Sequence, residues 1–209
     1  MLAQGDDCAR LVLASSSPRR KRLLAERQLR AHVIDPGVDD GQLAPGNVRP
    51  RDWAAALAHL KAQAGTAAAL ASGLTGPATI VLSADTVVDK DGQIIGQPKD
   101  IDDARRILKL LRNGSHRVIT AAVLVHAAGA DWVVDEVTVE VGDITDDAIE
   151  TYLATGTWRG KAGAYNLVER IEAGWPVRHL GDPTTVMGLP MDRLTPLIHR
   201  RLANAPWFA

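Results

Sequence analysis

The chain has 209 residues, enough to bury a hydrophobic core in one large domain or two small ones. Its 24 Lys and Arg residues against 25 Asp and Glu give a formal net charge of −1, and 46% of the residues are hydrophobic. This balance excludes a disordered tail protein and a globally basic nucleic-acid binder. The single cysteine, Cys8, excludes an internal disulfide framework and a cysteine-rich zinc site, and favours a reducing, cytoplasmic compartment.

No segment has the features of a membrane span or of a signal peptide. The longest apolar runs, such as 119–125, are far shorter than the roughly 20 residues that a transmembrane helix needs. Asp6 and Asp7 lie where a signal peptide would carry basic residues. We therefore expect no membrane partner.

The first half of the chain alternates strand and helix patterns. Ser17 is expected to cap the first helix, with Pro18 as its first residue, and Asp52 to cap the second. The predicted order is a strand at 10–14, a helix at 18–29, a strand at 31–35, a loop at 36–50, an alanine-rich helix at 52–71 and a strand at 78–88.

The second half contains two long β-branched runs around a turn at Gly129, which predict a central antiparallel pair. The predicted order is a hairpin turn at 89–92, a helix at 100–114, strands at 117–127 and 132–141, a helix at 145–154, a loop rich in Gly and Trp, and a helix at 190–203. No repeat or linker divides the chain, so we expect one mixed α/β domain over 1–209, with two lobes around a cleft.

The first segment with a chemical signature lies between the first strand and the first helix. Three serines at 15–17 precede Pro18, and four cations follow at 19–22. Each cation there is unfavourable by roughly 0.3–1 kcal/mol, because a helix N-terminus already carries partial positive charge. A bound phosphate reverses this, since backbone N–H groups, hydroxyls and guanidinium groups converge on its oxygens. The alternative is a capped helix with a solvated basic face.

Two further segments carry candidate chemistry. Asp85 directly follows the apolar run 80–84, where a carboxylate can orient a metal ion or take a proton from an attacking water. The alternative is an aspartate that satisfies local backbone donors. Residues 159–165 combine Lys161 with small residues that let a ligand approach the backbone, and Tyr165 either packs or lines a base pocket. A glycine-rich packing turn is the alternative there.

Four motifs together resemble one known family. They are LASSSPRR at 13–20, ADTVV at 84–88, KAGAY at 161–165 and VMGLP at 186–190. Their order and spacing resemble the Maf (septum formation) family of nucleoside triphosphate pyrophosphatases. The resemblance implies an ITPase-like α/β fold, an elongated mixed sheet flanked by helices. It also implies hydrolysis of a nucleoside triphosphate to the monophosphate and pyrophosphate with Mg²⁺ or Mn²⁺, and a homodimer.

The resemblance also implies roles for single residues. Asp85 matches the family's general base, Thr86 a position used in substrate discrimination, and Lys61 a lysine on the long helix, which is otherwise read as a surface lysine. Asp39 and Asp40, together with Asp85, match acids that hold the divalent cation. The residues expected to bind the phosphates are Ser15, Ser17, Arg19, Arg20, Lys61 and Lys161.

Three departures from the family pattern bear on rate and specificity. Gln97 stands where the family commonly has a lysine, although Lys99 is nearby, and Gly160 stands where it commonly has an acid. Residues 166–170 replace a segment whose glutamine helps to read the base; Asn166 and Trp175 are candidate replacements. Two alternatives follow: hydrolysis of non-canonical or modified nucleotides, and a catalytically weak nucleotide-binding regulator of cell division that acts through a protein partner.

Overall fold

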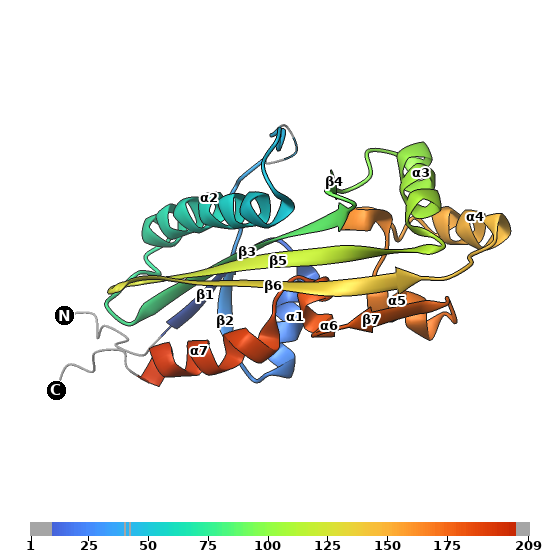
Figure 1. The fold of residues 1–209 in the computed structure, drawn as a ribbon. Helices are drawn as coiled ribbons and strands as arrows, with labels where there is room; N and C mark the ends of the chain where they lie inside the picture. The colour runs from blue at the N-terminus through green and yellow to red at the C-terminus, as the bar shows by residue number, and fades with distance from the viewer. Residues whose placement is uncertain (1–9, 40, 42, 204–209) are drawn as a thin grey trace.

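A mixed sheet forms the centre of the molecule in the computed structural model, which describes residues 10–39, 41 and 43–203 (Figure 1). Its order is β2-β1-β3-β5-β6-β7, and β4 pairs with β3. β1 runs parallel to β2 and β3, and the other pairs are antiparallel. The strands are β1 (Arg10–Ala14), β2 (Ala31–Ile34), β3 (Thr79–Lys90), β4 (Gln93–Ile95), β5 (Gly114–His126), β6 (Gly129–Val141) and β7 (Val177–Leu180). The expected mixed α/β sheet and its central antiparallel pair are confirmed.

Helices flank the sheet on both faces (Figure 1). They are α1 (Pro18–Glu26), α2 (Pro50–Ala71), α3 (Ile101–Leu111), α4 (Asp146–Ala154), α5 (Leu167–Glu172), α6 (Pro183–Met187) and α7 (Met191–Ala203), with one 3₁₀ turn, η1 (Ala162–Ala164). The expectation of a plain loop between α4 and α7 is wrong, because α5, β7 and α6 lie there. Asp52 is not the cap of α2: Arg49 holds that position, and its Nε donates to Asp52 Oδ2 over 2.7 Å.

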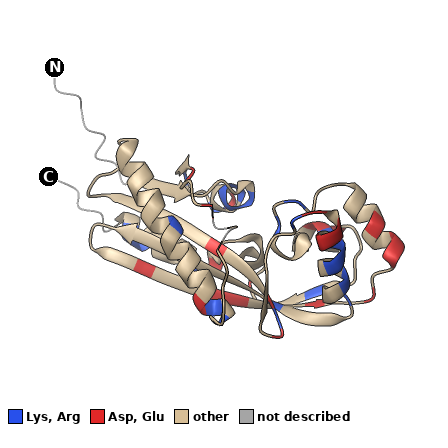
Figure 2. Cartoon of the chain, turned by 90° about the horizontal axis from the view of Figure 1, so that it is seen from above, with Lys and Arg blue, Asp and Glu red and all other residues tan. Residues whose placement is uncertain are grey.

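Alternate residues of each strand face opposite layers of helices. One face packs against α2, whose Ala54, Ala58 and Ala62 contact small and branched side chains of β5. The small residues bring the helix very close, and a Cβ added at Gly65 would lie 2.3 Å from the Cβ of Ala14. Figure 2 shows that α2 carries few charges compared with α3 and α4. In the described part of the chain, no helix combines the length and apolar character needed to cross a bilayer.

The opposite face packs against α1 and α7. Leu23 and Leu24 of α1 and Leu194 and Ile198 of α7 form one buried cluster with β1, β3 and β5. This layer fixes the start of α1 directly beside the end of β1, where the serine-rich segment lies.

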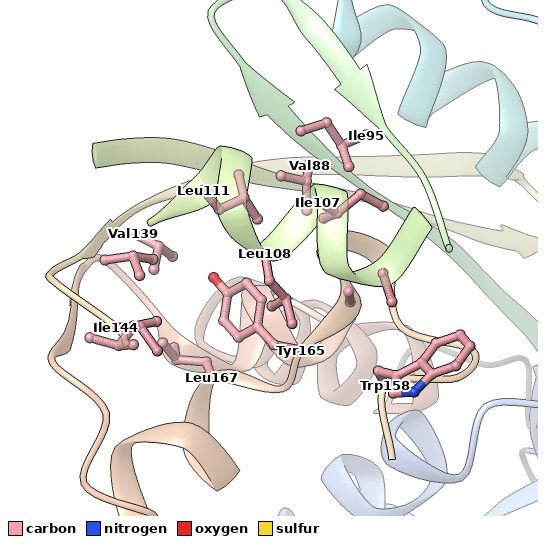
Figure 3. Close-up of a cluster of buried hydrophobic side chains, with 14 of the residues drawn as sticks. Val88, Ile95, Ile107, Leu108, Leu111, Val139, Ile144, Trp158, Tyr165 and Leu167 are labelled. Carbon is pink, nitrogen blue, oxygen red and sulfur yellow. The ribbon is translucent and has the colours of Figure 1, made fainter. Parts of the chain in front are cut away.

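A further cluster lies under α3, α4 and α5 (Figure 3). Tyr165 inserts among Leu108, Leu111 and Leu167, and its hydroxyl lies 2.7 Å from Nε2 of the buried His116. Burial raises the pKa of Tyr165 and lowers that of His116 to about 4, with Lys90 adding to the latter effect. The core therefore holds Tyr165 at the point where its chain segment enters the candidate site.

The edge of β3 next to β1 has a gap in its pairing. β1 pairs only as far as Leu82, and β4 pairs only from Val88 onward. Between them, among the described residues, no strand pairs with this edge of β3. Asp85 and Thr86 lie in the gap, so side chains from both faces of the sheet can reach one ligand there.

Candidate active site

A cleft of about 510 Å³ opens at this gap. It is lined by the β1–α1 loop and the start of α1, by β3, by the segment 159–166 and by the end of α6. Three residues of the β2–α2 loop and single residues of α2, β5 and the segment between β4 and α3 complete the lining. The predicted site residues among its lining are Ser15, Ser17, Arg19, Arg20, Lys61, Asp85, Thr86 and Lys161. These residues are spread over almost 150 positions of sequence, and the fold brings them to one cavity.

The hydroxyl of Ser15 has a fixed orientation. Its Oγ accepts the backbone N–H of Ser17 over 3.2 Å and Nη1 of Arg20 over 3.1 Å. Both partners are donors, so both oxygen lone pairs are occupied and the hydroxyl proton is left to donate. Ser17 occupies the N-cap position of α1, as predicted, but makes no side-chain capping bond. The start of α1 therefore places the Ser15 hydroxyl and the guanidinium groups of Arg19 and Arg20 at the cleft, which suits an anion.

Arg20 is held on three sides. Nε donates to the carbonyl oxygen of Gly188 over 2.9 Å, Nη1 to Ser15, and Nη2 to Thr86 Oγ1 over 3.4 Å. Gly188 has φ 110°, which favours glycine, and a Cβ there would lie 3.2 Å from Arg20 Nε. The guanidinium is thus preorganised at the cleft, in the planar form that matches phosphate oxygens.

Asp85 is paired with a lysine from the opposite wall. Lys61 Nζ donates to Asp85 Oδ1 over 2.6 Å, and the Asp85 residue is only 6% exposed. Lys61 comes from α2, which carries it over the sheet face toward which Asp85 points. A buried carboxylate with a cation beside it and an open cleft in front suits proton transfer or ion binding.

A second ion pair involves Lys161, which lines the cleft. Lys161, 7% exposed, donates from Nζ to Glu169 Oε2 over 2.5 Å. Burial lowers the pKa of the nearby Arg19, an effect that the carboxylate of Glu169 opposes. Sequence reasoning assigned no role to Glu169. The spacing of Asn166 and Glu169 marks only the start of α5, where Asn166 Oδ1 accepts the backbone N–H of Glu169 over 3.2 Å. It does not indicate the pairing of the Glu169 carboxylate with Lys161.

The departures from the family pattern have distinct locations. Gln97 lines the cleft, whereas Lys99 is exposed and is not among the lining residues. Asn166 lines it too, but its side-chain oxygen is used in capping. Trp175 is outside the lining and packs edge-on against Tyr152, with ring centroids 5.3 Å apart. Arg159, which sequence reasoning left without a role, supplies a further cation to the wall.

The acids expected to hold a cation are only partly brought together. Asp39 is exposed, accepts the backbone N–H of Gly41 over 3.2 Å and is not among the cleft-lining residues. Asp40 lies outside the described residues. Over the described ranges, no group of three or more His, Cys, Asp or Glu side chains is arranged to hold a metal. Of the three expected acids, Asp85 lines the cleft and fits the looser mode in which Mg²⁺ is held by one or two carboxylates and by substrate phosphates. Asp35, to which sequence reasoning assigned no role, also lines the cleft.

Comparisons with known proteins agree with the motifs. The dTTP/UTP pyrophosphatase of Alkaliphilus metalliredigens (strain QYMF) is 38% identical over 193 residues, covering 91% of this chain and 95% of that protein. The protein of the same name from Chromobacterium violaceum is 39% identical over 195 residues, covering 90% and 93%. That of Anaeromyxobacter dehalogenans (strain 2CP-1) is 37% identical over 202 residues, covering 95% and 97%. Residues 10–201 match the family described as Maf-like protein, and the chain belongs to this family.

Proposed function

We propose that this protein hydrolyses a nucleoside triphosphate to the nucleoside monophosphate and pyrophosphate. The observation that carries the proposal is the convergence in one cleft of the buried Asp85 carboxylate with Ser15, Arg20 and Lys161. A triphosphate needs hydroxyl, N–H and cationic partners, and its hydrolysis needs a group that takes a proton from water. The relatives named dTTP/UTP pyrophosphatase support this reaction class.

Each residue has a defined task in this reaction. Asp85 orients a water molecule against the α-phosphorus and accepts its proton. The bond from the α-phosphorus to the bridging oxygen breaks, and pyrophosphate leaves with that oxygen. Arg20 and Lys161 offset the negative charge that grows on the leaving group, and Ser15 donates its hydroxyl proton to a phosphate oxygen. Arg19 and Lys61 add positive charge to the two walls.

A divalent cation, Mg²⁺ or Mn²⁺, is part of the proposal. Asp85 would hold it together with the substrate phosphates, and Asp39 and Asp40 remain its proposed additional ligands. When bound, the cation supplies positive charge to the phosphate chain. The tasks of Ser15, Arg20 and Lys161 do not depend on its position.

The test is pyrophosphate release from a panel of triphosphates with Mg²⁺ and then with Mn²⁺. The panel contains dTTP, UTP, CTP, ITP and triphosphates with modified bases, because residues 166–170 depart from the family segment that reads the base. We expect release from at least one class of base, which identifies the preferred substrate. Binding of triphosphates without release from any of them would contradict the proposal and favour a nucleotide-binding regulator.

A further inference from the structure

A row of polar side chains crosses the sheet beneath the cleft. Thr86 of β3 is in register with Thr120 of β5, which is in register with Asp135 of β6. Most side chains of β5 and β6 on this face are apolar. Thr120 is fully buried, and so is Thr185 of α6, which covers the row. Burying polar groups in an apolar layer costs free energy unless each group is hydrogen-bonded. The hydrogen bonds of this row therefore indicate what it does.

The donor and acceptor of each bond in this row can be assigned. Thr120 Oγ1 donates to the carbonyl oxygen of Thr185 over 2.6 Å, and a carbonyl can only accept. Thr120 has one hydroxyl proton, and this bond uses it. The 2.9 Å contact between Thr86 Oγ1 and Thr120 Oγ1 therefore has Thr86 as its donor. The proton of Thr86 points away from the cleft, and its oxygen lone pairs face Arg20, whose Nη2 donates to it.

The far end of the row anchors α6. Thr185 Oγ1 donates to Asp135 Oδ2 over 2.6 Å. This bond fixes Thr185, whose backbone carbonyl accepts the hydrogen bond from the Thr120 hydroxyl. The same carbonyl accepts the backbone N–H of Gly188, and the Gly188 carbonyl accepts Arg20 Nε. Two series of hydrogen bonds therefore connect α6 to Arg20. One passes through the backbone of Gly188, and the other passes through the hydroxyls of Thr120 and Thr86.

We propose that Thr120 is a positioning residue for the reaction. Its hydroxyl oxygen accepts a hydrogen bond from the Thr86 hydroxyl, so the Thr86 oxygen keeps its lone pairs toward Arg20 and holds the guanidinium toward the triphosphate. The inference rests on the proposed function for the part that Arg20 plays. Without the Thr120 oxygen, the Thr86 hydroxyl loses the acceptor that fixes its direction. It then rotates among orientations in which its lone pairs no longer face Arg20, and the contact with the guanidinium, which can only donate, weakens.

The test compares kcat/KM for pyrophosphate release across a set of variants. Thr120→Val keeps the shape and removes the hydroxyl, and we expect kcat/KM to fall about tenfold, the size of one lost hydrogen bond to a charged group. Thr120→Ser keeps the hydroxyl and is expected to stay within about twofold of the natural protein. Thr79→Val is the matched control, because Thr79 is also buried and donates to a backbone carbonyl, that of Leu74, away from the cleft.

A double-mutant cycle with Thr86→Val separates positioning from packing. If Thr120 acts through Thr86, the double variant is no worse than Thr86→Val alone, within about twofold. Equal losses for Thr120→Ser and Thr120→Val, an additive double variant, or an unchanged Thr120→Val would each overturn the proposal. If Thr120→Val does not fold, Thr120→Ala takes its place.

The proposed function and this inference can fail separately. Absence of turnover by the natural protein contradicts the proposed function. In that case, the same variants are compared by calorimetry, using a triphosphate with a methylene bridge between the α- and β-phosphorus. The same pattern in the dissociation constant would support Thr120 as the positioning residue, and its absence would overturn it.

Discussion

Asp85 and Thr86 are neighbours in the chain, so their side chains leave β3 on opposite faces of the sheet. Asp85 meets Lys61 on the α2 face, and Thr86 meets Arg20 on the α6 face. In a fully paired strand, neighbouring strands would keep these two side chains apart. The gap between β1 and β4 lets both line one cleft.

Asp85→Asn tests the proton acceptor. The amide keeps the size of the side chain but cannot take a proton from water, and loss of a positioned base costs roughly 10²–10⁴ in rate. We expect kcat for pyrophosphate release to fall by at least about 100-fold, while the circular dichroism spectrum stays that of the natural protein. Asp91→Asn is the control, because Asp91 is exposed at the tip of the hairpin that follows the same strand. An undiminished kcat for Asp85→Asn would remove Asp85 from the mechanism.

Glu169→Gln tests the competition for Lys161. In the structure, the carboxylate of Glu169 holds the ammonium group that the proposed reaction needs at the phosphates. Removing this negative charge increases the attraction between the cleft and a triphosphate, and we expect KM to fall several-fold at low salt, with a smaller effect at high salt. The exposed Glu172→Gln on the same helix should leave KM unchanged. A higher KM for Glu169→Gln would mean that Glu169 supports the substrate-binding form of Lys161.

At the scale of elements, the long hydrophobic patterns of the sequence were sufficient to predict the long strands and helices. The short capping patterns that mark the short helices were not used. Periodicity over many residues predicted that β5, β6 and α2 exist, but not their bounds. Both strands begin three residues earlier than predicted, α2 begins two residues earlier, and Gly114, predicted to close a helix, opens β5. α5 and α6 are only 6 and 5 residues long, too short for periodicity to show them. Their starts were nevertheless marked, by Asn166 with Glu169 three residues later and by Asp182 before Pro183.

The candidate site was predictable to a similar degree. The motifs and the family resemblance identified eight cleft-lining residues, from Ser15 to Lys161, because each motif is a local pattern. They did not identify Asp35 or Val118, which also line the cleft. The gap in β3 pairing, the Lys161–Glu169 pair and the Thr86–Thr120 contact depend on strand register and helix placement. The strand register and the Thr86–Thr120 contact join residues far apart in the chain, and the Lys161–Glu169 pair depends on where the short helix α5 lies. No local pattern specifies these contacts.

Gly65→Ala tests how closely α2 must approach β1. The added methyl group would lie 2.3 Å from the Cβ of Ala14, so the helix and strand must move apart. Overpacking of this kind costs about 1–3 kcal/mol in the free energy of unfolding, and we expect a loss of that size in urea denaturation. Ala14→Gly combined with Gly65→Ala removes the clash and should recover part of the loss. No recovery in the double variant would show that the clash is not the cause.

At the scale of the whole molecule, the buried His116 makes stability depend on pH. Its pKa is lowered to about 4 by burial, with Lys90 contributing, against about 6.5 in an unfolded chain. Between these values the unfolded state binds more protons, so the free energy of unfolding falls as pH decreases through this window, by about 1.4 kcal/mol per pH unit from this residue. Above about pH 6.5 the contribution is constant.

His116→Gln isolates this effect. Glutamine does not titrate and retains groups that can bond the Tyr165 hydroxyl. Urea denaturation at pH 7.5, 6.0 and 5.0 should show a shallower decrease for the variant than for the natural protein, whereas the exposed His32→Gln should not change the slope. Equal slopes for all three proteins would exclude His116 as the source of the pH dependence.

The position of the bond that breaks tests the proposed function most directly. Phosphorus NMR spectroscopy of a triphosphate from the responsive class of base, incubated with the natural protein and with Asp85→Asn, distinguishes all products at once. We predict resonances of the nucleoside monophosphate and pyrophosphate for the natural protein and unreacted triphosphate for the variant. Resonances of a nucleoside diphosphate and inorganic phosphate, or equal turnover by Asp85→Asn, would contradict attack on the α-phosphorus assisted by Asp85.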